Sequence, residues 1–199
     1  MLLTLDTTHK ILSLALMKNS QLLASMKTDT NTLSGDMLLP TILDFFKENH
    51  ISPQDISNLV CTTGPGSFTG VRIGIAFAKA FHLANKIPLY GLNTFEALAW
   101  KLPRPLTVVI DSYRGDFFAQ DFEKNSVSAP YIISVEEIIQ KQKHPITGFI
   151  KEEDKNALQK VYIAYVNNTA VNLGEIFYTA QQKLTSPFPY YIRSADVSH

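Results

Sequence analysis

A glycine-rich turn between an apolar run and a long helical pattern constrains the fold of this chain most strongly. Ile56–Thr62 reads as a buried strand, and Thr69–Asn85 has the period of a helix. Between them, Gly64 and Gly66 can adopt positive φ angles or let another backbone approach closely, and Pro65 stiffens the turn. The stretch therefore predicts a strand, a tight turn and a helix.

The start of this helix could hold an anion, because free N–H groups and the positive end of the helix dipole coincide there. Gly64, Gly66, Ser67 and Thr69 are the candidate contacts. The structural alternative is a simple strand-to-helix connection in which Thr69 caps the helix. The residues alone leave both interpretations open.

Two common phosphate-binding motifs are excluded at this turn. A Walker A loop ends in Gly-Lys-Ser/Thr, but no lysine lies between Asn49 and Ala78. A dinucleotide-binding loop would need glycine in place of Thr69. The turn belongs to neither class.

The turn and six other segments resemble one bacterial family. Gly64–Gly74 is similar to the signature of TsaB (YeaZ-type) proteins. The other matching segments follow in the same order as in that family: Leu5–Thr8, Leu38–Pro40, Gly91–Ala99, Val109–Asp111, Arg114–Gly115 and Pro189–Arg193. The resemblance is dense up to Gly115 and thin between Phe122 and Phe188.

This resemblance implies an actin-like ATPase (ribonuclease H-like) α/β fold and a role in making threonylcarbamoyladenosine in tRNA. TsaB proteins are subunits that work with a catalytic TsaD and an ATPase, TsaE. The resemblance therefore implies a non-catalytic scaffold without a cofactor of its own, which pairs with a TsaD-like subunit and reaches tRNA only through the complex. A nucleotide could lie at the partner interface. In this superfamily an acidic residue that ends a strand at the position of Asp6 approaches nucleotide phosphates. The alternative is that Asp6 only forms the turn after its strand.

Composition agrees with a folded protein that does not bind tRNA alone. The 199 residues are 45% hydrophobic and 18% charged, with a formal net charge of zero. Proteins that hold nucleic acid alone usually carry a basic excess. The N-terminal residues do not form a signal-peptide pattern, no apolar run reaches the length of a membrane span, and Cys61 is the single cysteine. We therefore expect a cytoplasmic protein.

Periodicity predicts a mixed α/β chain in two domains, residues 1–102 and 103–199. The boundary falls at two prolines that flank Arg104. The strands predicted before it are Leu2–Asp6, Ile11–Met17, Gln21–Lys27, Ile56–Thr62 and Ile87–Tyr90, with helices over Asp36–Asn49, Thr69–Asn85 and Asn93–Lys101. After it we expect a hairpin of Leu106–Asp111 and Phe117–Phe122, a short helix starting near Ser134, strands Ile146–Ile150 and Val161–Tyr165, and a final helix Ala170–Leu184.

The helix after the turn has more apolar surface than one sheet contact needs. Its polar stripe is narrow, and Gly70, Gly74 and Ala78 form a row of small residues that would let another helix approach closely. We predict a partner interface, also used for a homodimer when the partner is absent, that consists of Leu39, Leu43, Gly70, Arg72, Gly74, Ala78 and His82. The alternative is that a neighbouring helix of the same chain covers this surface.

The sequence lacks the residues that two alternative enzymatic functions would need. A free-standing ATPase or kinase of the same superfamily needs a second phosphate loop and acid, and Asp111 is the only comparable strand-end acid. A metallopeptidase needs metal ligands, but the five histidines form neither a His-x-x-x-His nor a His-Glu-x-x-His pattern. We therefore predict no catalytic residue and no metal ligand.

Overall fold

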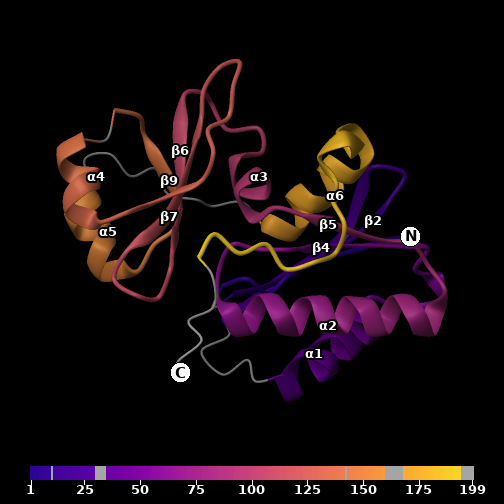
Figure 1. Ribbon diagram of the computed structural model, residues 1–199. Coiled ribbons are helices and arrows are strands. Elements are labelled where there is room, and N and C mark those ends of the chain that lie inside the picture. The colour runs from indigo at the N-terminus through magenta and orange to yellow at the C-terminus, as the bar shows by residue number, and fades with distance from the viewer. Residues whose placement is uncertain (10, 30–34, 142, 160–167, 194–199) are drawn as a thin grey trace. The chain divides into compact units, whose positions relative to one another are not determined.

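The computed structural model describes residues 1–9, 11–29, 35–141, 143–159 and 168–193 (Figure 1). The chain divides into two compact units. Unit 1 contains residues 1–100 and 166–189, and unit 2 contains residues 101–165 and 190–199. Each unit is built around one sheet.

Unit 1 has a five-stranded sheet in the order β3-β2-β1-β4-β5. Its strands are β1 (Leu2–Asp6), β2 (Ile11–Lys18), β3 (Gln21–Asp29), β4 (Asn58–Thr62) and β5 (Leu89–Leu92). Short links join β1, β2 and β3, so these strands pair antiparallel. β4 and β5 each follow a helix and run parallel to β1. The three predicted antiparallel strands are therefore confirmed.

Helices cover both faces of this sheet (Figure 1). The helices α1 (Gly35–Glu48) and α2 (Phe68–Asn85) pack on the face that carries Leu3 and Leu5 of β1. The short α3 (Thr94–Ala99) and α6 (Thr169–Thr179) pack on the other face, which carries Leu2. Neighbouring leucines of β1 thus serve two cores, since successive side chains of a strand point to opposite faces.

α6 returns to unit 1 although it lies far along the chain. The hydroxyl of Thr4 donates to the carbonyl of Ala170 (2.6 Å), and the Asn172 amide donates to the carbonyl of Ala97 (2.8 Å). Leu173 and Ile176 are fully buried in the core beside them. The prediction that residues 103–199 form one domain is therefore wrong for this segment, because its apolar face completes the first sheet.

Unit 2 has a four-stranded sheet in the order β8-β7-β6-β9. The strands are β6 (Leu106–Asp111), β7 (Phe117–Phe122), β8 (Tyr131–Ile133) and β9 (Ile146–Phe149), and α4 (Val135–Lys141) and α5 (Glu152–Leu158) pack against them. The predicted hairpin of β6 and β7 is confirmed, whereas β8 and α5 are additions. The predicted strand Val161–Tyr165 lies outside the described residues.

Helix ends differ from the predictions, most clearly at the start of α2 and at the end of α6. Ser67, rather than Thr69, caps α2, because the Ser67 hydroxyl accepts a hydrogen bond from the Gly70 N–H at 3.3 Å. The predicted final helix Ala170–Leu184 is interrupted at Ala180 and continues as the 3-10 turn η2 (Gln181–Lys183). In the described part of the chain, no helix has the length and apolar character needed to cross a bilayer.

Candidate functional site

Asp6 ends β1 inside the protein. Its side chain is buried, with 1% of the residue exposed. One carboxylate oxygen, Oδ1, accepts hydrogen bonds from the N–H of Thr8 (2.9 Å), the hydroxyl of Thr8 (2.7 Å) and the hydroxyl of Thr62 (2.7 Å). Burial raises the pKa of Asp6, and the hydrogen bonds from Thr8 and Thr62 oppose that rise. The carboxylate therefore joins the β1–β2 turn to β4.

The glycine-rich loop packs directly on this turn. A Cβ atom on Gly66 would lie 2.3 Å from the carbonyl oxygen of Thr8, and one on Gly70 would lie 2.1 Å from that of Thr7. The N–H of Ser67 donates to the Thr8 carbonyl at 2.7 Å. The glycines are thus needed for close contact between two parts of the same chain, and this loop amide is already hydrogen bonded.

The remaining loop residues frame the start of α2. Gly64 has a φ of 102° and its carbonyl accepts a hydrogen bond from the N–H of Thr94 at 2.8 Å. Thr69 lies exposed in the first turn of the helix. The predicted anion or nucleotide site at Asp6, the glycines, Ser67 and Thr69 remains a prediction, and the structure adds that its acid is enclosed.

The row of small residues on α2 does not receive a partner helix. A Cβ on Gly74 would lie 2.1 Å from the hydroxyl oxygen of Thr7, and Ala78 is fully buried in the core. Gly70 contacts the same turn, because its carbonyl accepts a hydrogen bond from the Thr7 hydroxyl at 2.8 Å. The prediction that these three residues belong to the interface is therefore wrong, since Gly70 and Gly74 face the chain's own first turn and Ala78 lies in the core.

His82 also has an internal role. Its side chain is half-buried, and its Nδ1 contacts the carbonyl oxygen of Ile87. Lys86 closes the helix in a left-handed conformation, with its N–H donating to the His82 carbonyl. His82 thus belongs to the C-terminal cap of α2, and its predicted place in the partner interface is not supported.

An apolar face remains exposed on α1 and α2, which we call the α1–α2 face. It includes the predicted Leu39 (52% exposed) and Leu43 (48%) and, unexpectedly, Leu83 (71%). Its members are Leu39 and Leu43 of α1 and Phe68, Arg72, Ala76, Ala80 and Leu83 of α2. The residues of α2 recur at three- and four-residue steps, so they share one side of the helix. The same spacing is present in the sequence, where the row of small residues is the more conspicuous signal of a close approach.

Arg72 contributes the charge on this face. Its guanidinium lies over the ring of Phe68, 3.7 Å from the ring centroid. Such a contact keeps a cation beside an aromatic surface at the start of the helix. α1 and α2 are themselves joined below the surface by an edge-on contact of Phe46 with Phe81, whose centroids are 6.2 Å apart.

Other reactive groups are engaged elsewhere. In unit 2, Asp111 accepts a hydrogen bond from the N–H of Tyr113 (2.6 Å), and its other oxygen lies 3.3 Å from the Lys151 ammonium. Burial raises the pKa of the Cys61 thiol to about 12, so it is not a thiolate at neutral pH. Within the described ranges, no three His, Cys, Asp or Glu side chains are grouped so that they could hold a metal ion.

Comparison with known proteins assigns the family. The family model described as "TsaD: tRNA N6-adenosine threonylcarbamoyltransferase" matches residues 32–184. The chain belongs to this family. The predicted resemblance to its TsaB (YeaZ-type) relatives is confirmed by proteins named "tRNA threonylcarbamoyladenosine biosynthesis protein TsaB". The one from Bacillus subtilis is 32% identical over 98 residues, and the one from Escherichia coli is 29% identical over 129 residues.

The alignments to TsaB proteins are partial. They cover 49% and 62% of this chain, but only 43% of the Bacillus subtilis TsaB and 55% of the Escherichia coli TsaB. The chain therefore spans about half the length of the TsaB proteins that it matches. The structure of YeaZ from Pseudomonas aeruginosa superposes with a TM-score of 0.71 at 19% identity, covering 96% of this chain and 99% of that one. This match confirms the predicted actin-like ATPase fold.

Proposed function

We propose that the chain is a non-catalytic scaffold subunit of the bacterial complex that forms N6-threonylcarbamoyladenosine in tRNA. It pairs with a TsaD-like catalytic subunit through the α1–α2 face and works with a TsaE-like ATPase. It contacts tRNA only within the complex, and the complex acts in the cytoplasm. The names of the TsaB relatives support the process, although the alignments cover only part of those proteins.

The observation that carries this proposal is the exposed α1–α2 face. Leu39, Leu43 and Leu83 each expose about half or more of their surface on neighbouring helices. Burying apolar surface contributes about 25 cal/mol per Å². Grouped exposed apolar side chains typically mark a site of protein association. A stable partner that covers this face explains why the sequence keeps leucines there.

The proposed lack of catalysis rests on where the acids lie. A phosphate-transferring site of this superfamily would use the strand-end acid Asp6, but its Oδ1 is enclosed by Thr8 and Thr62. The loop amide of Ser67 is likewise bonded to the first turn. These contacts favour a structural role for Asp6 and for the glycine-rich loop. In this proposal a nucleotide, if required, lies at the interface with the catalytic subunit, and the chain has no cofactor of its own.

A reconstitution separates this proposal from its alternatives. The chain, a TsaD-like subunit and a TsaE-like ATPase are combined with tRNA, and threonylcarbamoyl transfer is measured with and without the chain. We expect transfer to require the chain, while the chain alone hydrolyses neither ATP nor peptide. ATP turnover by the isolated chain would instead support a free-standing ATPase or kinase. Metal-dependent peptide cleavage would support a metallopeptidase.

A further inference from the structure

The outer edge of β5 presents backbone groups that the sheet does not use. β5 is the last strand of its sheet and pairs in parallel with β4 alone. The N–H of Leu59 donates to the carbonyl of Pro88 at 3.0 Å. In a parallel ladder, alternate residues bond to the same neighbouring strand. Leu89 and Gly91 therefore direct their N–H and C=O groups away from the sheet.

A segment near the C-terminus covers half of this edge. We call residues 184–187 the strap. Thr185 exchanges two hydrogen bonds with Gly91, whose N–H donates at 2.8 Å and whose carbonyl accepts at 2.7 Å. This bridge is isolated, and the chain turns directly after it, where the N–H of Phe188 donates to the carbonyl of Ser186 at 2.8 Å. Within the described part of the chain, the outward N–H and C=O of Leu89 have no hydrogen-bond partner.

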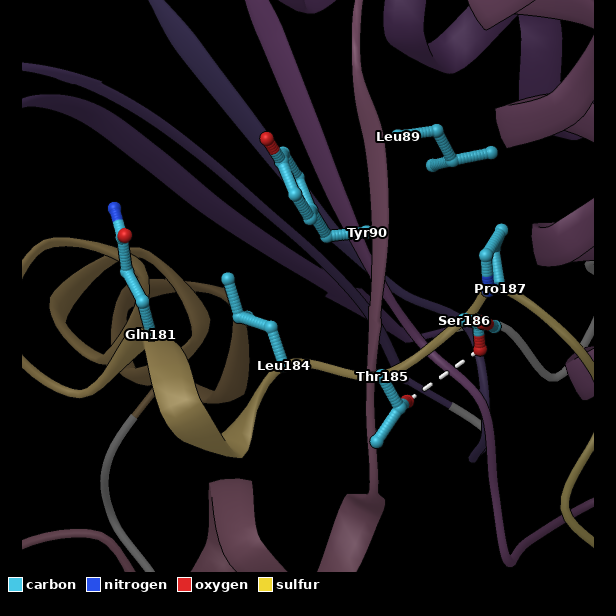
Figure 2. A pocket seen from close by; sticks show the side chains of 7 residues that line it. All are labelled: Leu89, Tyr90, Gln181, Leu184, Thr185, Ser186 and Pro187. Atoms are coloured by element: carbon cyan, nitrogen blue, oxygen red, sulfur yellow. Dashed lines mark hydrogen bonds between the residues drawn. The ribbon is translucent and has the colours of Figure 1, made fainter.

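A cavity of about 610 Å³ opens where the pairing stops (Figure 2). In the figure, Tyr90, Gln181 and Leu184 lie on one side of β5, and Leu89 and Pro187 lie on the other. The two sides belong to different cores, because Leu89 packs with α1 and α2 while Tyr90 packs with α6. The side chains that line the cavity are all uncharged: Leu89, Tyr90, Gln181, Leu184, Thr185, Ser186 and Pro187.

We propose that this edge binds a short, extended, uncharged peptide segment of a partner protein, which pairs through its backbone with Leu89. The strap shows that the edge accepts an extended chain, because Thr185 is held at Gly91 by the same pair of bonds. A peptide residue beside Leu89 would continue that ladder past the point where the strap turns. Strand addition of this kind obtains affinity from main-chain bonds and selectivity from side-chain pockets.

The lining predicts which peptides fit. Successive side chains of an extended peptide point to opposite faces, so one would lie near Tyr90 and Gln181 and the next near Pro187. Neither place offers a charge to pair with an acidic or basic side chain. The site is on the edge of β5 and not on the α1–α2 face, so it does not depend on the proposed pairing with a TsaD-like subunit.

The test uses the full chain labelled with ¹⁵N and two probes. One probe is acetyl-Ala-Val-Ala-amide, and the other is the same tripeptide with its backbone amides N-methylated. We expect the first probe to shift the resonances of the Leu89 N–H and the Gln181 amide in a saturable manner. The methylated probe, which lacks the three backbone N–H donors, should bind at least tenfold more weakly. Equal binding of both probes, or shifts confined to other regions, would overturn the proposal.

A pair of variants tests the backbone donor itself. Leu89→Pro removes the outward N–H, and proline is tolerated at an edge position whose N–H faces outward. Leu89→Ala removes a similar side chain but keeps the N–H. Both variants lose the leucine side chain, which lines the cavity. With the Gln181 amide as reporter, we therefore compare them with each other and expect the proline variant to bind the unmethylated probe at least tenfold more weakly than the alanine variant. Equal affinity of the two variants would contradict a backbone site.

Discussion

The side-chain hydroxyl of Thr7 donates a hydrogen bond to the carbonyl oxygen of Gly70, 2.8 Å away, and so joins the first turn of the chain to α2. The approach is close enough that a Cβ on Gly70 or Gly74 would overlap Thr7. One side of α2 is therefore committed to packing within the chain. The opposite side, with Ala76 and Leu83, is exposed.

Replacing Gly74 should destabilise the fold itself. In Gly74→Leu the new side chain must displace Thr7, whose hydroxyl oxygen would lie 2.1 Å from the added Cβ. Overpacking of this kind costs about 1 to 3 kcal/mol. Ala76→Leu is the matched control on the exposed side of α2, and surface changes usually stay within about 0.5 kcal/mol. Urea unfolding of both variants measures the difference, and equal stabilities would show that α2 faces the other way.

Asp6 should give the protein a distinct pH dependence. Burial raises its pKa above the usual value of 3.8. When the pKa of an acid is higher in the folded state than in the unfolded state, its protonation stabilises the folded protein. This stabilisation is complete below the unfolded-state pKa and is lost as the pH rises through the folded-state pKa. Asp6→Asn removes the titrating group. We therefore expect the free energy of unfolding of the parent chain to fall relative to the variant as the pH rises from 3.8 towards neutrality. Unfolding curves at several pH values test this, and parallel pH profiles would contradict it.

The isolated chain should form a two-fold dimer through the α1–α2 face. A closed dimer that uses one patch twice is the simplest way to cover that face when no partner is present. Leu83, with 71% of its surface exposed, is the residue whose change should disturb folding least. Sedimentation should show that Leu83→Glu shifts the chain towards monomer while its circular dichroism is unchanged. A parent chain that stays monomeric at high micromolar concentration would argue against self-association.

Local sequence patterns predicted most strands of unit 1 and the hairpin of unit 2. Alternating apolar residues and short polar links identified the three antiparallel strands, and the hairpin of β6 and β7 followed from the same kind of signal. The return of α6 could not be found this way. The sequence of α6 shows an apolar side but does not show which of the two sheets that side covers. Only the packing of Leu173 against distant strands assigns the helix to unit 1.

The candidate site shows a similar limit. The spacing of Gly70 and Gly74 correctly indicated that something approaches α2 closely, but spacing does not identify the approaching group. It is Thr7, more than 60 residues earlier in the chain. The enclosure of Asp6 likewise depends on Thr62, which is 56 residues away. Both features depend on contacts between residues far apart in the sequence, which local sequence patterns cannot predict.

The affinity for a TsaD-like subunit tests the account most directly. It should be measured by titration for the parent chain, for Leu43→Glu and for the internal control Thr4→Ser, whose residue is fully buried. If the α1–α2 face binds the catalytic subunit, Leu43→Glu should keep its melting temperature and lose at least tenfold in affinity, which corresponds to about 1.4 kcal/mol. Thr4→Ser should bind like the parent chain. Unchanged affinity of a folded Leu43→Glu variant would contradict the central claim.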